Sequence, residues 1–280
     1  MPQSLKFLSM KTIRIILVFI VLFPLSENTF AGWLITGKNI SGEGRDIPER
    51  IFIEHHKIKM EWPDFIATFD LKAMTLILVD PIKLTYYQGT LSDYISGVKS
   101  LKLAALKESL NGLTDGQAVE SEKVYSAQIE HYFDIPSLPA GIVSVKKTEV
   151  ELKMVGYLTS KYDISSNGVR QEEVWIAPGM QAGEGFDWGI YYKFLKATGI
   201  EDKALIYMNS PEYFDLLKNG FPLRRITTAD GFRTEFQVNR LEEKTIPDYE
   251  FYTPALCKKL TIADWLGQQM DKEEVFDDYE

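Results

Sequence analysis

The chain has 280 residues, a formal net charge of −9 at pH 7 and a single cysteine, Cys257. The acidic excess disfavours nucleic acid and anionic membranes as partners, and one cysteine excludes an internal disulfide. A mature chain of about 250 residues can bury about 70–75% of its unfolded surface, so it needs no covalent cross-link. We expect Cys257 to be buried and inert, with intermolecular pairing as the alternative.

Residues 1–31 have the pattern of a secretory signal peptide. Lys11 and Arg14 form a basic start, residues 15–25 are apolar, and Thr29-Phe30-Ala31 offers a cleavage site. The apolar run is shorter than the roughly 20 residues of a membrane-spanning helix, which disfavours an uncleaved anchor. We expect cleavage after Ala31 and a soluble mature chain, residues 32–280, in the periplasm or otherwise exported, without stable membrane insertion.

The first part of the mature chain favours β structure. Residues 52–62 alternate between apolar and polar side chains, which predicts one half-buried strand. Asp80-Pro81 predicts a turn between strands at 75–79 and 84–87. The apolar face of the strand at 52–62 is expected to carry Phe52, His56, Ile58, Met60 and Trp62.

At residue 91 the apolar period changes to that of an amphipathic helix, with Ser92 as the expected N-cap and Gly112 as its end. A second, weaker helix or an irregular segment is expected at 116–133. The apolar stripe of the first helix is Leu91, Tyr94, Ile95, Val98, Leu101 and Ala105.

Strands return at 148–178, where Asn167-Gly168 is a strong hairpin signal. Residues 187–199 have helical spacing. Ser210 followed by Pro211 predicts the start of a short helix that ends before Gly220.

A last hairpin pairs residues 222–228 with 232–241 across Asp230-Gly231, and Thr261 with Asp264 is expected to cap a final short helix. Residues 271–280 form an acidic tail, which is expected to be solvated.

Blocks of strands separated by blocks of helices indicate an α+β fold, with an antiparallel sheet and helices packed on one face. We therefore expect a single β-rich domain over residues 32–280, with helical insertions near 91–133 and 187–220.

Two groups of segments resemble a known family. The first group is Lys57-Ile58-Lys59-Met60-Glu61-Trp62, Phe69-Asp70-Leu71-Lys72 and Lys83-Leu84-Thr85-Tyr86-Tyr87, and the second is Asn219-Gly220-Phe221-Pro222-Leu223-Arg224 and Ile246-Pro247-Asp248-Tyr249-Glu250-Phe251-Tyr252-Thr253-Pro254. In this order they resemble the DUF4412 family of uncharacterised exported bacterial proteins, which is similar to the LolA/LolB lipoprotein carriers.

The resemblance implies a strongly curved antiparallel sheet, an incomplete barrel, with helices covering the concave face. In the carriers that face holds acyl chains. The two helical insertions depart from the pattern, and they leave open whether the cavity is empty or filled.

No catalytic or metal-binding pattern is recognisable. On a regular strand His55 and His56 would point to opposite faces, so they could not bind one ion together. A Gly-x-Ser-x-Gly element and a phosphate loop are both absent from the sequence. We expect no enzyme activity, no cofactor and no metal.

The sequence is therefore interpreted as a carrier of an apolar ligand such as a lipid or acyl chain. The alternative is a non-catalytic module with a filled core that binds another envelope protein. Large aromatic and sulfur-containing side chains suit adaptable apolar sites. The residues expected to line a cavity are Met60, Trp62, Met74, Tyr86, Met154 and Trp175.

Overall fold

The computed structural model describes residues 32–40, 44–110, 115–132, 141–183, 185–200, 206–229 and 232–277. The predicted signal peptide, Gly112 and the Asp230-Gly231 turn lie outside the described residues. The described strands and helices from Trp33 onward all belong to one compact unit.

Twelve strands in the described part of the chain form one sheet, in the order β12-β6-β5-β4-β3-β2-β1-β11-β10-β9-β8-β7. Strands β1 and β11 are neighbours at the centre, where the two halves of the sheet meet. Strands β7 and β12 form the two separate edges of the sheet, so it is not closed into a barrel. The first half consists of β1 (Trp33–Ile40), β2 (Asp46–Glu54), β3 (Lys57–Glu61), β4 (Ile66–Asp70), β5 (Thr75–Asp80) and β6 (Thr85–Thr90).

The second half of the sheet runs in chain order from the edge strand β7 inward to β11, which pairs with β1. It consists of β7 (Val143–Met154), β8 (Tyr157–Ser166), β9 (Val169–Pro178), β10 (Gly220–Ala229) and β11 (Phe232–Glu243), and β12 (Lys258–Lys259) pairs with β6 at the far edge. The pairing of β12 with β6 is parallel, and the remaining neighbouring strands are antiparallel. The predicted α+β class with a curved antiparallel sheet is confirmed.

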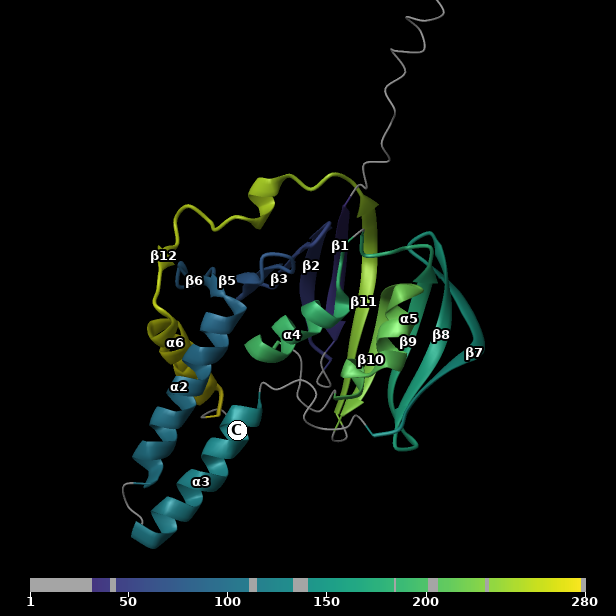
Figure 1. The fold of residues 1–280 in the computed structure, drawn as a ribbon. Coiled ribbons are helices and arrows are strands. Elements are labelled where there is room, and N and C mark those ends of the chain that lie inside the picture. The colour runs from purple at the N-terminus through teal and green to yellow at the C-terminus, as the bar shows by residue number, and fades with distance from the viewer. Residues whose placement is uncertain are drawn as a thin grey trace, which may run out of the picture. The chain divides into compact units, whose positions relative to one another are not determined.

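The helices follow the strands in two blocks, as Figure 1 shows. The first block is α2 (Leu91–Leu110) and α3 (Asp115–Tyr132). The second is α4 (Trp188–Thr198), the short 3-10 helix η1 (Ile206–Asn209) and α5 (Pro211–Lys218). A 3-10 turn, η2 (Asp248–Phe251), precedes α6 (Ile262–Asp277), which packs beside α2 and β6.

The strand predicted at 52–62 is in fact a hairpin of β2 and β3. His55 has φ = 54°, and Glu54 pairs with Lys57 across the two-residue turn. Residues directly opposite each other on antiparallel strands point to the same face, and Phe52 lies opposite Lys59. Ile58 and Met60 alternate with Lys59, so Phe52 is on the other face from them. The prediction of a single strand was wrong because the alternation continues through the turn.

Two consecutive turns are built in the same way, ten residues apart. Backbone N–H groups of Lys72 and Ala73 donate to Asp70 Oδ1, and those of Ile82 and Lys83 donate to Asp80 Oδ1. Each turn ends on a residue with positive φ, Met74 at 54° and Leu84 at 52°. In each turn the carboxylate of the Asp that ends the strand accepts the hydrogen bonds of two backbone N–H groups that have no partner in the sheet.

The helix predicted from residue 91 begins there, but its cap differs from the prediction. Thr90 Oγ1, not the Ser92 side chain, accepts a hydrogen bond from the backbone N–H of Asp93 at 3.0 Å. At α5 the prediction is confirmed, because Ser210 Oγ accepts from the backbone N–H of Tyr213 at 3.2 Å and Pro211 is the first helical residue.

Cys257 is only partly buried, so the expectation of a fully buried thiol was wrong. It lies just before β12, the two-residue strand at the edge of the sheet. Desolvation and the nearby charge of Asp80 raise the pKa of its thiol, which disfavours the reactive thiolate.

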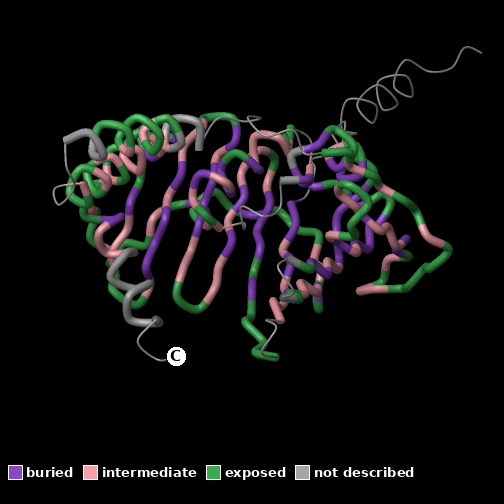
Figure 2. The backbone as a smooth tube through the Cα atoms, turned by 90° about the horizontal axis from the view of Figure 1, so that it is seen from below, coloured by how far each residue is buried: buried purple, intermediate pink, exposed green. Residues whose placement is uncertain are grey.

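Buried and exposed residues are distributed unevenly over these elements. Figure 2 shows buried stretches running through the strands, whereas the helices at its upper left, α2 and α3, are mainly exposed or intermediate. Much of the core therefore lies on the sheet and beneath α4 and α5, and Trp265 of α6 is buried as well.

Candidate ligand-binding site

A cavity of about 840 Å³ lies between the sheet and the helices α4 and α5. We call the sheet face that borders it the helix-covered face. Ile51 of β2 and Met60 of β3 are cross-strand partners on this face, and both line the cavity. From the helices, Leu195 of α4 and Leu217 of α5 complete the opposite wall.

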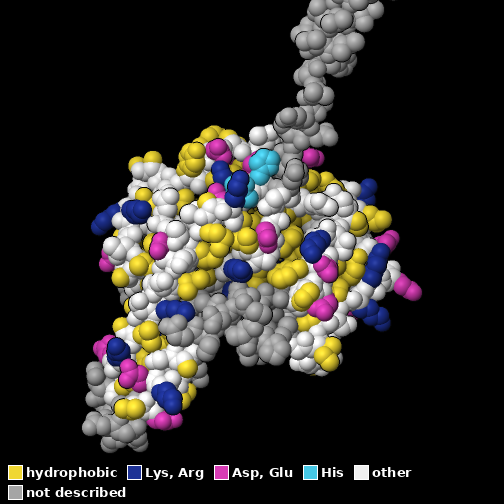
Figure 3. All heavy atoms as spheres, viewed as in Figure 1, with side chains coloured by type: hydrophobic (Ala, Val, Ile, Leu, Met, Phe, Trp, Pro, Cys, Tyr) yellow, Lys and Arg dark blue, Asp and Glu magenta, His cyan; other side chains and the backbone are white. Residues whose placement is uncertain are grey.

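Most of the lining is aliphatic or aromatic. Figure 3 shows hydrophobic side chains gathered near the centre of this side of the molecule, where α4 lies in Figure 1. The described residues that line the cavity are Asn39, Ile40, Ile47, Glu49, Ile51, Ile58, Met60, Trp62, Asp64, Phe65, Trp188, Tyr191, Tyr192, Leu195, Ile200, Met208, Tyr213, Phe214, Leu217, Phe221, Pro222, Arg225, Thr227, Thr234 and Phe236.

Caps define the two ends of α4, and side-chain contacts hold the helix over the sheet. The Asp187 carboxylate accepts a hydrogen bond from the backbone N–H of Ile190, and Gly199 ends the helix with φ = 72°. Trp188 lies 5.9 Å from the ring of Phe221 on β10, and Tyr191 Oη donates to Met60 Sδ at 3.1 Å. These contacts fix one wall of the cavity.

Where the cavity meets β10, a polar cluster replaces the apolar lining. Glu172 of β9 has a fully buried side chain, and its carboxylate accepts hydrogen bonds from Arg225 Nε at 2.7 Å, Tyr207 Oη at 3.0 Å and Tyr213 Oη at 3.3 Å. Burial raises the pKa of Tyr207 far above its ordinary value, and the negative charge of Glu172 raises it further. Tyr207 therefore remains a neutral hydrogen-bond donor. The positive charge of Arg225 balances the negative charge of Glu172.

A second polar contact lies across the sheet from this cluster. Asn39 Nδ2 of β1 donates to Glu49 Oε2 of β2 at 2.6 Å, and both residues line the cavity. Glu49 is 6% exposed, so its carboxylate is largely shielded from solvent.

The structure brings two of the six residues predicted for the cavity together in its wall, Met60 and Trp62. The other four are not among the described lining residues. Met74 ends the turn before β5, Tyr86 lies on β6, and Met154 is the last residue of β7.

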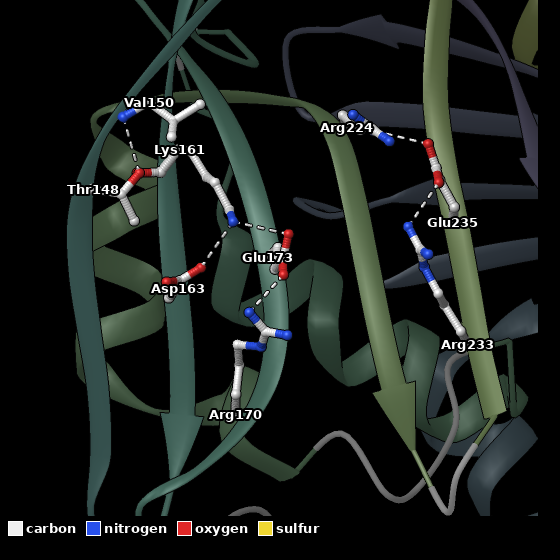
Figure 4. A network of polar contacts seen from close by, with 9 residues as sticks. All are labelled: Thr148, Val150, Lys161, Asp163, Arg170, Glu173, Arg224, Arg233 and Glu235. Atoms are coloured by element: carbon white, nitrogen blue, oxygen red, sulfur yellow. Dashed lines mark hydrogen bonds and ion pairs between the residues drawn. The ribbon is translucent and has the colours of Figure 1, made fainter.

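Trp175, the fourth of these, lies on the face of the sheet opposite the helices. Lys161 Nζ is 5.4 Å and Arg224 Cζ is 4.6 Å from its ring centroid, which is the arrangement of two cation–π contacts. Figure 4 shows Lys161 beside Asp163 and Glu173, and Arg224 beside Glu235. Lys161 Nζ lies 2.9 Å from Glu173 Oε2, and Arg224 Nε donates to Glu235 Oε1 at 2.8 Å. Trp175 is thus part of a packed polar surface.

The helix at 187–199 was predicted, but the six residues predicted for the cavity include none from α4 or α5 and none of the polar cluster. The signal for the wall was present, because Trp188, Tyr191, Tyr192 and Leu195 fall at helical spacing. Arg225 gave a weaker signal, since neighbouring strand residues point to opposite faces and one of Arg224 and Arg225 must therefore face the covered side. The sequence does not show which of the two it is; in the structure it is Arg225, which pairs with the buried carboxylate of Glu172 on β9.

Among the described helices, none is long and apolar enough to cross a membrane. The described residues also contain no group of three or more His, Cys, Asp or Glu side chains arranged to hold a metal ion.

Comparisons with known proteins give similarities of overall structure only. No family model and no curated protein matches the chain. An uncharacterised conserved protein from Thermus thermophilus is similar with a TM-score of 0.42 and 8% identity, over 87% of this chain and 98% of that one.

Two further solved structures match with lower scores. PNGF-II has a TM-score of 0.36 and 11% identity, over 85% of this chain and 32% of its own. The MucA/MucB complex of Pseudomonas aeruginosa has a TM-score of 0.35 and 10% identity, over 84% of this chain and 59% of the matched chain. Similarities at this level assign neither a family nor a function, and membership of the DUF4412 family stays a prediction.

Proposed function

We propose that this protein is a non-catalytic binding protein for an apolar ligand such as a lipid or an acyl chain. The observation that carries the proposal is the cavity of about 840 Å³ between the sheet and helices α4 and α5. Ligand sites typically measure about 300–1,000 Å³ and are lined mainly by hydrophobic and aromatic side chains with a few polar groups. This cavity has both properties.

Packing supports the same proposal. Protein interiors are close-packed, and voids larger than a water molecule are few. A hydrocarbon chain that enters such a space gains about 0.8 kcal/mol for each methylene group removed from water. The partly exposed residues Ile47, Asp64 and Thr234 line the cavity as well, so it reaches solvent and offers a route of entry.

We also propose that the ligand is bound outside the cytoplasm, in the periplasm or an equivalent exported location. The support is the basic, apolar and small-residue pattern of residues 1–31. Export would place an apolar carrier between membranes, where a lipid needs shielding from water.

A pair of variants tests the site. Ile47 lines the cavity and is 40% exposed, whereas Ile82 is 70% exposed and lies in the turn between β5 and β6. We expect Ile47→Glu to weaken binding of the uncharged fluorophore N-phenyl-1-naphthylamine about tenfold or more, because a carboxylate at the cavity is costly to desolvate. Ile82→Glu is the matched control and should bind as the unmodified protein does, as followed by fluorescence titration.

The two possible failures have different meanings. Equal binding by both variants would show that the fluorophore does not use this cavity. No uptake of fluorophore by the unmodified protein would contradict the carrier proposal and favour the alternative of an envelope interaction module with a filled core.

A further inference from the structure

We propose that the ligand is an amphiphile with an anionic oxygen head group, a carboxylate or a phosphate, and that Arg225 binds this head. The inference rests on the proposed function and specifies its ligand class. Its basis is the asymmetric burial of the ion pair between Arg225 and Glu172 at the β10 side of the cavity.

The pair presents its cation to the cavity and buries its anion. The side chain of Arg225 is 18% exposed and lines the cavity, whereas that of Glu172 is 0% exposed and is not part of this lining. Arg225 is therefore the member of the pair that a ligand in the cavity can contact. A guanidinium has five N–H donors in one plane and can hold acceptors on more than one edge.

The hydrogen bonds of Glu172 keep the guanidinium group in place. Arg225 donates to Glu172 through Nε and approaches Met208 Sδ through Nη2 at 3.4 Å. Tyr213 donates to the same oxygen, Glu172 Oε1, and Tyr207 donates to Oε2. Because these two tyrosines are themselves buried, the orientation of Arg225 is set before a ligand arrives, which lowers the cost of binding.

Hydroxyl groups lie next to the cation on the same face. Thr227, two residues along β10 from Arg225, pairs across the sheet with Thr234 of β11, and both line the cavity. A head group with several oxygen acceptors can thus meet a charged donor and hydroxyl donors together.

The acidic residues of the lining lie elsewhere. Glu49 is on β2, which is separated from β10 by β1 and β11, a span of three strand spacings or about 14 Å. Asp64 lies between β3 and β4, farther along the same direction. The apolar residues Ile51, Ile58 and Met60 lie on β2 and β3 and offer a surface for the tail. The proposal therefore places the head at Arg225 and the tail toward β3, where an anionic head would meet the two carboxylates.

Stability alone does not explain the ion pair. A buried ion pair is often no more stabilising than well-packed apolar side chains of similar size, because both charges lose their hydration. Recognition of an anionic head is a role that an apolar pair could not perform.

Four ligands with the same tail test the inference: dodecanoic acid, dodecyl phosphate, dodecanol and dodecylamine. We expect one or both anions to bind about ten- to a hundredfold more tightly than dodecanol, as is typical of a charge-assisted hydrogen bond. Dodecylamine should bind more weakly than dodecanol. The relative affinities of the acid and the phosphate then identify the head group.

The double variant Arg225→Met with Glu172→Met removes both charges and avoids leaving one of them buried alone. Tyr207 and Tyr213 lose the acceptor of their hydroxyl groups in this variant, so thermal unfolding first checks that it is folded. The variant Arg225→Gln with Glu172→Gln keeps an acceptor oxygen for both tyrosines and serves as the second test. In either folded variant the two anions should bind no more tightly than dodecanol.

Arg224→Met is the control, because Arg224 faces Trp175 and Glu235 on the opposite side of the sheet. It should keep the preference.

Each contrary result has one meaning. Equal binding of all four ligands, a preference for the amine, or an anion preference that survives in a folded double variant would overturn the head-group inference and leave the carrier proposal standing. Failure of the unmodified protein to bind any of the four would overturn the carrier proposal itself.

Discussion

Glu172 connects the core of the protein with the cavity wall. Its carboxylate is fully buried and accepts hydrogen bonds from two tyrosines and one arginine. A buried carboxylate is tolerated only when it is paired and hydrogen-bonded. The same contacts require Tyr207 to stay protonated, which is why its pKa is raised by burial and by Glu172.

This linkage predicts a pH dependence of stability. The unfolded chain releases the Tyr207 proton near pH 10, whereas the folded protein keeps it to a higher pH. The stabilising contribution of Tyr207 is therefore complete below pH 10 and declines above it, by about 1.4 kcal/mol per pH unit. Urea unfolding between pH 8 and about 11.5 measures the difference in free energy of unfolding between the unmodified protein and Tyr207→Phe. This difference should be constant up to about pH 10 and should shrink as the pH rises further.

The control for this measurement is Tyr249→Phe, because Tyr249 is 67% exposed. If Tyr207→Phe and Tyr249→Phe showed the same dependence on pH, Tyr207 would not be held protonated by its surroundings.

Single residues were the least predictable part of the site. Met60 and Trp62 were chosen as large apolar residues, and the cavity contains both. Trp175 was chosen for the same reason, but it packs between Lys161 and Arg224 on the other face. Side-chain type predicts burial in both cases. It does not distinguish a cavity wall from a site covered by long basic side chains, which bury aromatic surface equally well.

At the scale of elements, alternation predicted β structure but not where strands end. Continuous alternation through His55 hid the turn between β2 and β3, which requires a non-glycine residue with φ = 54°. The turn at Asn167-Gly168 was predictable because these residues favour positive φ, and both adopt it, at 52° and 79°. Turns are thus predictable where the residue type favours the left-handed conformation.

Glycine residues matter for the packing of α2 against α6. Gly97 of α2 faces Ile262 of α6, and a Cβ atom at Gly97 would overlap Cγ1 of Ile262. Gly267 of α6 has no atom within 4 Å of such a position. A methyl group at Gly97 would therefore clash with the neighbouring helix, whereas a methyl group at Gly267 has free space.

Substitution of these glycines by alanine should have effects of opposite sign. Gly267→Ala is expected to raise the free energy of unfolding by up to about 1 kcal/mol, the difference in helix propensity. Gly97→Ala gains the same propensity, but overpacking against β-branched Ile262 costs about 1–3 kcal/mol. The net effect should be a loss of up to about 2 kcal/mol. Thermal or urea unfolding measures both, and stabilisation by Gly97→Ala would contradict close packing of α2 on α6.

For the whole molecule, the class of fold was predictable and the cavity was not. Strands and helices occur in separate blocks, which is typical of an antiparallel sheet with helices on one face. Whether helices such as α4 fill that face depends on how Trp188 and Tyr191 pack against Phe221 and Met60. Those contacts join residues up to 131 positions apart. No local pattern in the sequence carries that information.

The measurement that tests the central claim most directly is native mass spectrometry of the mature protein, purified from its host envelope without detergent, followed by organic extraction and lipid analysis. The account predicts a discrete mass above that of the polypeptide, which extracts as an amphiphile with a carboxylate or phosphate head. A bare polypeptide mass, together with no uptake of N-phenyl-1-naphthylamine or the dodecyl ligands, would contradict it.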